Sequence, residues 1–243
     1  MNRNTRPRKG QRSGMVPPAA ASRRESATAR RDRAEAVSRV LGEAYPDAHC
    51  SLNFASPFQL VIATILSAQC TDKRVNMVTP ELFCRWPDPA ALAGANQHDV
   101  ESVIRSTGFF RAKAKSILGC ARALVDRHGG EVPRTMDDLV RLPGVGRKTA
   151  NVVLGTAFGI ASGVVVDTHV GRISRRLGLT RATDAVRAER DLVRALSREH
   201  WIAFSHRLIE HGRGVCAARS PACDECALVD LCPRVGVKPR GSR

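Results

Sequence analysis

The sequence lacks the features that define several protein classes. It has no run of about 18 apolar residues, so no membrane-spanning helix is expected, and it has no apolar segment typical of a secretory signal. Aromatic residues make up only 4% of the chain, and no basic helix with Trp or Phe anchors points to a membrane surface. There is no tandem repeat, and the apolar run at 164–166 is the only pattern typical of a strand.

Acidic residues are scarce beside basic ones. The 243 residues include 39 Lys and Arg against 23 Asp and Glu, a net charge of +16. A chain with this charge is expected to bind nucleic acid.

Half of the excess charge lies in residues 1–33, where ten basic and two acidic residues give +8. This segment is rich in Ser, Ala, Pro and Gly and has no apolar periodicity, so we expect a disordered basic tail that strengthens non-specific DNA binding. A solvated tail without a role and an organelle transit peptide remain open.

Apolar spacing with a period near 3.6 predicts an all-α protein. Ser56 and Pro57 are typical of an N-cap and a first helical residue, and Asp72 and Asp167 are further N-cap candidates. Residues 57–66 carry a single apolar stripe. The expected helices span about 57–66, 72–84, 89–94, 97–106, 110–128, 135–141, 147–158, 168–177, 184–199 and 201–211.

Residues 142–151 read Leu-Pro-Gly-Val-Gly-Arg-Lys-Thr-Ala-Asn, a glycine turn that leads into a helix. Gly144 and Gly146 let backbone amides come close to an anion, and the start of helix 147–158 adds partial positive charge. With helix 135–141 the turn forms a helix–hairpin–helix unit. Such turns are common as purely structural connections, but the net charge favours phosphate binding here.

Lys148 lies about 120° from the centre of the apolar stripe of its helix and can face a cleft. A neutral lysine could attack C1′ of a deoxyribose, expel the base and form a Schiff base that allows elimination of the 3′ phosphate. Arg147 and the helix N-terminus would favour the neutral amine. Asp167 could stabilise the cationic sugar or relay a proton. A phosphate counter-ion for Lys148 and a plain N-cap for Asp167 are equally compatible with the spacing.

The last four cysteines follow a metal-binding pattern, Cys-x6-Cys-x2-Cys-x5-Cys, and a proline follows the last one. They are Cys216, Cys223, Cys226 and Cys232. Four thiolates suit zinc or an iron–sulfur cluster, and the presence of only one Cys-x2-Cys pair favours the cluster. The four earlier cysteines are expected to be buried free thiols. Arg213 and Arg219 flank Cys216 and either contact phosphate or are solvated.

Two further residues suit an enzyme that extrudes a nucleotide and must fill the vacated space. Gln69 offers an amide, and Phe109, after Gly108, offers an apolar wedge. From the residues alone, an ordinary core position is favoured for Phe109.

In combination these motifs resemble endonuclease III, the iron–sulfur member of the helix–hairpin–helix DNA glycosylase superfamily. The resemblance covers about residues 35–235. The matching stretches are 66–72, 130–133, 142–151, 166–169, 211–213 and the four-cysteine ending.

The resemblance implies two helical domains with DNA in the cleft between them. One is a six-helix bundle at 50–160. The other joins 34–49 to 161–235 and carries a [4Fe–4S] cluster on the four cysteines, and residues 236–243 form a tail.

The resemblance makes Lys148 the Schiff-base nucleophile and Asp167 the catalytic carboxylate, and it places Gln69 inside the opened duplex. Phe109 stands where the family usually has a leucine wedge. The other expected DNA contacts are Gly144, Gly146, Arg147 and Arg219.

The implied function is removal of oxidised pyrimidines from duplex DNA in base excision repair, by a glycosylase that also cleaves abasic sites as a lyase. The alternatives are a mismatch adenine glycosylase, against which Lys148 and the end at residue 243 argue, a non-catalytic hairpin protein that binds DNA, and the same fold holding zinc. We expect a monomer without a membrane partner, in the cytoplasm with the nucleoid, while organelle targeting by residues 1–33 stays open.

Overall fold

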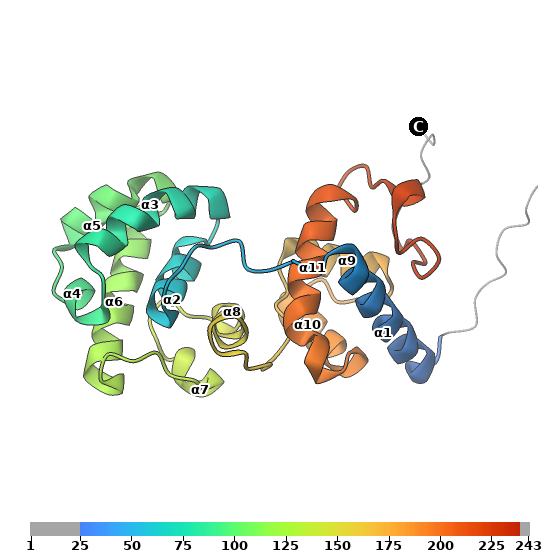
Figure 1. Cartoon of the computed structure of the whole chain (residues 1–243), viewed down its shortest axis with the longest axis horizontal. Helices are drawn as coiled ribbons and strands as arrows, with labels where there is room; N and C mark the ends of the chain where they lie inside the picture. Colours follow the sequence, from blue (N-terminus) through green and yellow to red (C-terminus); the bar gives the residue numbers. More distant parts are fainter. Residues whose placement is uncertain (1–24, 239–243) are drawn as a thin grey trace, which may run out of the picture.

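Helices are the regular elements of residues 25–238, the part of the chain that the computed structural model describes (Figure 1). No strand occurs in this part, and the apolar run at 164–166 forms none. The all-α prediction is confirmed. None of the helices between residues 25 and 238 is long and apolar enough to cross a membrane.

From α2 onward the α-helices follow the predicted order along the chain, and α1 precedes them. The α-helices are α1 (Ala27–Ala44), α2 (Pro57–Leu66), α3 (Asp72–Arg85), α4 (Pro89–Ala93), α5 (Gln97–Ile104), α6 (Phe110–His128), α7 (Met136–Leu139), α8 (Arg147–Phe158), α9 (Thr168–Arg176), α10 (Ala185–Ala195) and α11 (Trp201–Gly214). Three short 3₁₀ helices are η1 (Arg105–Thr107), η2 (Arg198–His200) and η3 (Cys223–Glu225).

The structure corrects the predicted helix at 184–199, which ends at Ala195. Leu196 is extended, with its side chain buried. Its carbonyl, no longer inside a helix, accepts a hydrogen bond from Trp201 Nε1 at 3.0 Å. Leu196 therefore lies in the core and contacts the start of α11. Because of these two constraints, α10 ends at Ala195, three residues before η2 begins.

Side-chain caps explain most of the helix starts. Ser56 Oγ accepts from the Gln59 amide at 3.2 Å, with Pro57 as first helical residue, as predicted. The prediction that Asp72 is an N-cap is wrong by one residue, because the Thr71 hydroxyl accepts from the Arg74 amide at 3.3 Å. Asp72 instead lies in the first turn of α3.

Two groups of buried residues form separate cores, and the chain begins and ends in the same one. Helices α2–α8, here called the bundle lobe, enclose the first core. Helices α1 and α9–α11 with the loop 216–232, here called the terminal lobe, enclose the second. Figure 1 shows α1 beside the last helices of the chain, although about 120 residues of bundle separate them in sequence.

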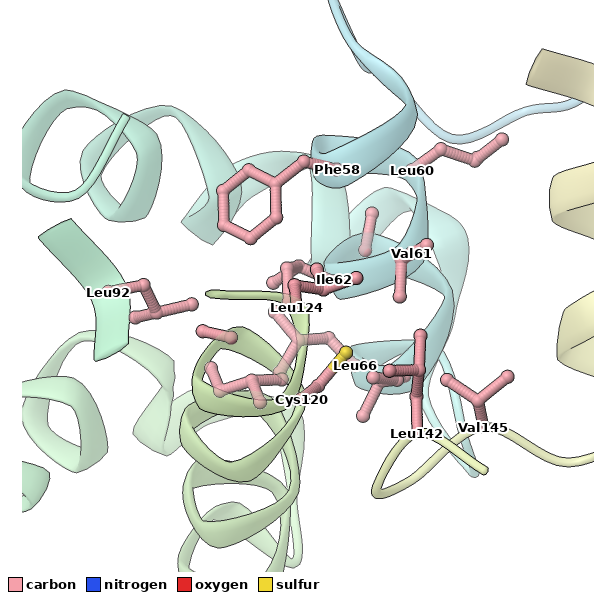
Figure 2. Packing of buried hydrophobic residues seen from close by; sticks show 14 of the residues in the cluster. Phe58, Leu60, Val61, Ile62, Leu66, Leu92, Cys120, Leu124, Leu142 and Val145 are labelled. Atoms are coloured by element: carbon pink, nitrogen blue, oxygen red, sulfur yellow. The ribbon is translucent and has the colours of Figure 1, made fainter. Parts of the chain in front are cut away.

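Helix α2 lies at the centre of the bundle lobe and is buried on most sides. The sequence predicted one apolar stripe, but Leu60 and Ala63 are buried as well as that stripe. A helix that is apolar all round is expected to be enclosed by others, and α2 packs against α3, α6 and α8. Figure 2 shows Phe58 and Ile62 on the side of Leu124, while Leu60 points the opposite way.

The predicted basic tail is shorter than residues 1–33, because α1 begins at Ala27. Ser26 caps this helix. Arg33 donates to the carbonyls of Leu177 and Leu231, and Arg31 donates to the carbonyl of Arg194. Basic residues that the sequence assigned to DNA therefore hold α1 to the other elements of the terminal lobe. The prediction for residues 1–24, and most of the predicted tail at 236–243, lies outside the described residues.

Candidate active site and nucleic-acid interface

The glycine turn joins α7 to α8 and is anchored in the bundle core. Leu142 and Val145 are buried, whereas Pro143, Gly144 and Gly146 are exposed. Figure 2 shows Leu142 and Val145 directed toward Leu66 of α2. The apolar side chains therefore fix the turn from below and leave its glycine backbone at the surface. Helix α7 is shorter than the predicted 135–141.

The two glycines of the turn are required for different reasons. Gly144 has φ +79°, and a Cβ there would lie 2.8 Å from Ser116 Cβ, so only glycine fits. Gly146 has φ −93°, and a Cβ there would meet no atom within 4 Å. As the N-cap of α8 it offers no side-chain hydrogen bond, so the first amides of α8 remain available to an anion.

Lys148 and Asp167 line the same pocket. The other lining residues are Val166, then Thr168, Gly171 and Arg175 of α9, and residues 183–185 and 188 before and within the start of α10. Lys148 is exposed in the first turn of α8, and Asp167 is half-buried at the start of α9. The structure brings the two residues together across 19 positions of sequence.

Asp167 is also the N-cap of α9, as the sequence predicted. Its Oδ1 accepts from the Val170 amide at 2.8 Å. The cap holds the carboxylate in one orientation in the lining of the pocket, so the structural and the chemical roles of Asp167 are compatible.

Arg147 has a partner that the sequence did not reveal. Its Nε and Nη2 donate to the two carboxylate oxygens of Glu189 at 2.9 and 3.0 Å, and this contact raises the pKa of the guanidinium. The positive charge that Arg147 places beside Lys148 is therefore paired with the Glu189 carboxylate. The signal for Glu189 was a charged residue on the apolar stripe of α10, between Ala188 and Leu192.

Gln69 and Phe109 share an unusual backbone conformation. Their φ angles are +51° and +48°, in the left-handed region that non-glycine residues rarely adopt. Both side chains are exposed, and Phe109 retains 69% of its accessible surface. A core role for Phe109 is therefore wrong. Strain of this kind persists where the surroundings enforce it, often at functional sites.

A buried lysine supports the turn before Phe109. Lys113 of α6 is only 5% exposed, and its Nζ donates to the Thr107 carbonyl at 2.8 Å. Burial lowers the pKa of this amine. Sequence reasoning missed Lys113, which looked like one more surface charge of α6.

The four C-terminal cysteines line one pocket of the terminal lobe. Burial, followed by the neighbouring thiols, raises the pKa of Cys226 and of Cys232. Arg176 donates to Cys216 Sγ at 3.2 Å and to the carbonyls of Ala217 and Ala218. A guanidinium thus lies beside the thiol set and can balance negative charge on it.

His211 also contacts this set. Its Nε2 lies 3.6 Å from Cys226 Sγ, and its Nδ1 lies 3.0 Å from Tyr45 Oη of α1. Burial lowers the pKa of the imidazole. The earlier cysteines differ from expectation in part, since Cys120 is buried, with its pKa raised to about 12, whereas Cys84 is exposed.

The two arginines near Cys216 have different surroundings. Arg213 donates to Asp72 Oδ2 at 2.8 Å and to Ser51 Oγ at 3.0 Å, so it links the terminal lobe to the bundle lobe. Arg219 is exposed on the loop that follows Cys216.

Residues 62–198 match the model of the HhH-GPD superfamily of base excision DNA repair proteins. An endonuclease III of Synechocystis sp. (strain ATCC 27184 / PCC 6803 / Kazusa) is 56% identical over 204 residues, which are 84% of this chain and 93% of that protein. The chain belongs to the endonuclease III family.

Two solved endonuclease III structures share the fold. One is a non-covalent endonuclease III–DNA complex, with a TM-score of 0.79 and 43% identity, covering 84% of this chain and 95% of that chain. The other is a trapped endonuclease III–DNA covalent intermediate, described as an estranged-adenine complex, with a TM-score of 0.79, 43% identity and coverage of 84% and 96%.

The two glycines of the turn give a matched pair of substitutions. Gly144→Ala should lower the free energy of unfolding by about 1–3 kcal/mol, because it forces a left-handed alanine against Ser116. Gly146→Ala should lower it by less than about 1 kcal/mol and still weaken binding to abasic DNA. Urea denaturation and a DNA titration measure both quantities. Equal losses of stability in the two variants would contradict the steric account of Gly144.

Proposed function

We propose that the chain is a bifunctional DNA glycosylase and abasic-site lyase that removes oxidised pyrimidines from duplex DNA in base excision repair. The observation that carries this proposal is the pocket shared by Lys148 and Asp167, next to the glycine turn. An amine, a carboxylate and an anion-binding backbone there meet the needs of attack on a sugar in DNA.

In the proposed reaction the neutral Lys148 Nζ attacks C1′ of the damaged nucleotide. The bond from C1′ to the base breaks, and the base leaves with the bonding electrons and takes up a proton. The sugar ring then opens to an iminium between C1′ and Nζ. Loss of a C2′ proton expels the 3′ phosphate, and water hydrolyses the imine to return the free lysine.

Asp167 supports this sequence from the start of α9. Its carboxylate would stabilise positive charge that develops on the sugar, or take a proton from the attacking amine. The N-cap hydrogen bond to the Val170 amide holds the group in one orientation. Trapping of a covalent DNA intermediate in an endonuclease III of 43% identity supports a covalent route for this chain as well.

We place the DNA between the two lobes, which we equate with the predicted domains at 50–160 and at 34–49 with 161–235. Exposed Gly144 and Gly146 would hold a backbone phosphate, and Arg219 would add charge on the terminal lobe. Gln69 and Phe109, exposed on left-handed turns of the bundle lobe, would fill the space left by an extruded nucleotide.

We further propose that Cys216, Cys223, Cys226 and Cys232 hold a [4Fe–4S] cluster. The four thiols line one pocket. Their spacing, with only one Cys-x2-Cys pair, favours the cluster over zinc. When bound, the cluster would cross-link the loop 216–232 through its four sulfur ligands.

Lys148→Gln should abolish cleavage of abasic DNA and the covalent complex that borohydride traps, because glutamine cannot form an imine. The measurement is a gel assay on duplexes with thymine glycol or an abasic site, with and without borohydride. Lys238→Gln, which loses the same charge near the C-terminus, is the control. Normal trapping and cleavage by Lys148→Gln would refute the mechanism. If the wild-type chain bound DNA in a salt-sensitive way but did not cleave it, the protein would be a non-catalytic DNA-binding protein.

Asp167→Asn should slow base removal by about 10²–10⁴-fold and leave DNA affinity and thermal stability close to wild type. Stability should persist because asparagine caps a helix as well as aspartate does. Asp88→Asn, which makes the same change at the N-cap of α4, is the control. An unchanged rate of base removal would show that Asp167 serves only as a cap.

Purified protein should contain iron and acid-labile sulfide in equal amounts and absorb visible light. Elemental analysis and an absorption spectrum test this, and Cys223→Ser should reduce both signals. Colourless protein with stoichiometric zinc would contradict the cluster.

A further inference from the structure

Glu189 of α10 is an acidic residue in the interior, only 6% exposed. Three hydrogen bonds end on its carboxylate. Arg147 donates from Nε at 2.9 Å and from Nη2 at 3.0 Å, and Asn151 donates from Nδ2 at 2.8 Å. Both donors belong to α8, so one side chain of the terminal lobe holds a helix of the bundle lobe.

The same carboxylate lies against the segment that leads to Asp167. A Cβ added to Gly163 would lie 2.1 Å from Glu189 Oε1, so this segment passes directly over it. Ser162 Oγ donates to Asn151 Oδ1 at 2.7 Å and joins the segment to the same network. Glu189 therefore lies where α8, α10 and residues 159–167 meet.

The spacing of the donors bears on Lys148. Arg147 and Asn151 are four residues apart and share one face of α8, and Lys148 follows Arg147 directly. A rotation of α8 about its axis, or a slide along α10, would break at least one of the three hydrogen bonds. The network therefore restrains the helix that carries Lys148 against the segment that ends at Asp167.

Stability alone is a poor account of this arrangement. Burying the Glu189 carboxylate costs desolvation free energy, and this cost offsets much of its attraction to the half-exposed Arg147. Glu189 is also a lining residue of a second opening beside Arg147, not of the pocket that holds Lys148 and Asp167. It has no access to the reacting atoms from there.

We propose that Glu189 is a positioning residue for the lyase and glycosylase reactions, which sets Lys148 relative to Asp167. The proposal rests on the function proposed above. Glu189 acts through Arg147 and Asn151 and does not touch DNA. Displacing a catalytic group by about 1 Å can cost about 10²-fold in rate.

The test is the rate of abasic-DNA cleavage by Glu189→Gln, compared with Glu189→Asp. Glutamine replaces one acceptor oxygen by a donor and leaves Arg147 unbalanced, so kcat should fall by about 10²-fold. KM and the Kd for abasic DNA should stay within about twofold of wild type. Glu189→Asp keeps the charge and both acceptors and should restore part of kcat. Glu199→Gln, an exposed change in η2 of the same lobe, is the control.

Arg147→Lys provides a second variant if Glu189→Gln does not fold. Arg147 is half exposed, and lysine can make one contact where arginine makes two, so kcat should fall by less than in Glu189→Gln. An unchanged kcat in either variant that folds would overturn the proposal, as would equal losses in kcat and in DNA affinity. Lys148→Gln, assayed in parallel, separates failure of the positioning role from failure of the proposed function. Normal cleavage by Lys148→Gln refutes the proposed function, whatever the Glu189 variants show.

Discussion

The burial of Leu142 and Val145 is the constraint on which the candidate site depends. Both side chains lie in the bundle core, and the Val145 amide closes the turn on the Leu142 carbonyl at 3.1 Å. The chain between them must pass over Ser116 with φ +79° at Gly144. Helix α8 therefore starts at a place that the core determines, and Lys148 is fixed in its first turn. The exposed glycine backbone of the turn thus gains its rigidity from apolar packing beneath it.

Features that short segments encode could be read from the sequence. The cap at Ser56, the cap at Asp167 and the start of α8 agree with prediction, because each depends on residues within one helical turn. The spacing of the last four cysteines likewise predicted that they gather, and they line one pocket. Chemistry confined to a turn or a loop leaves a local pattern.

Contacts between distant segments left no such pattern. Arg147 and Glu189 are 42 residues apart, and Tyr45 and His211 are 166 apart. Lys113 reaches only six residues back, yet nothing nearby shows that its amine is buried. In each case a charged or polar side chain is enclosed because two elements pack over it. That packing is a property of the whole fold. A single sequence therefore shows at most a charged residue on the apolar stripe of a helix.

Several arginines that contribute to the net charge make contacts inside the protein. Arg33, Arg172, Arg176 and Arg213 bind carbonyls, thiols or carboxylates inside the protein, as Arg147 does. Part of the basic charge counted in the net +16 thus lies on guanidinium groups whose donors are occupied inside the protein. Two exposed residues are held in an unfavourable backbone conformation. Left-handed backbone at Gln69 and Phe109 costs about 1–2 kcal/mol per residue, and an exposed aromatic ring adds unfavourable contact with water. Such positions are retained where the direction of the side chain matters more than the free energy of folding that it costs. In the proposed function, a base stack that covers Phe109 would recover the cost of exposing the ring to water.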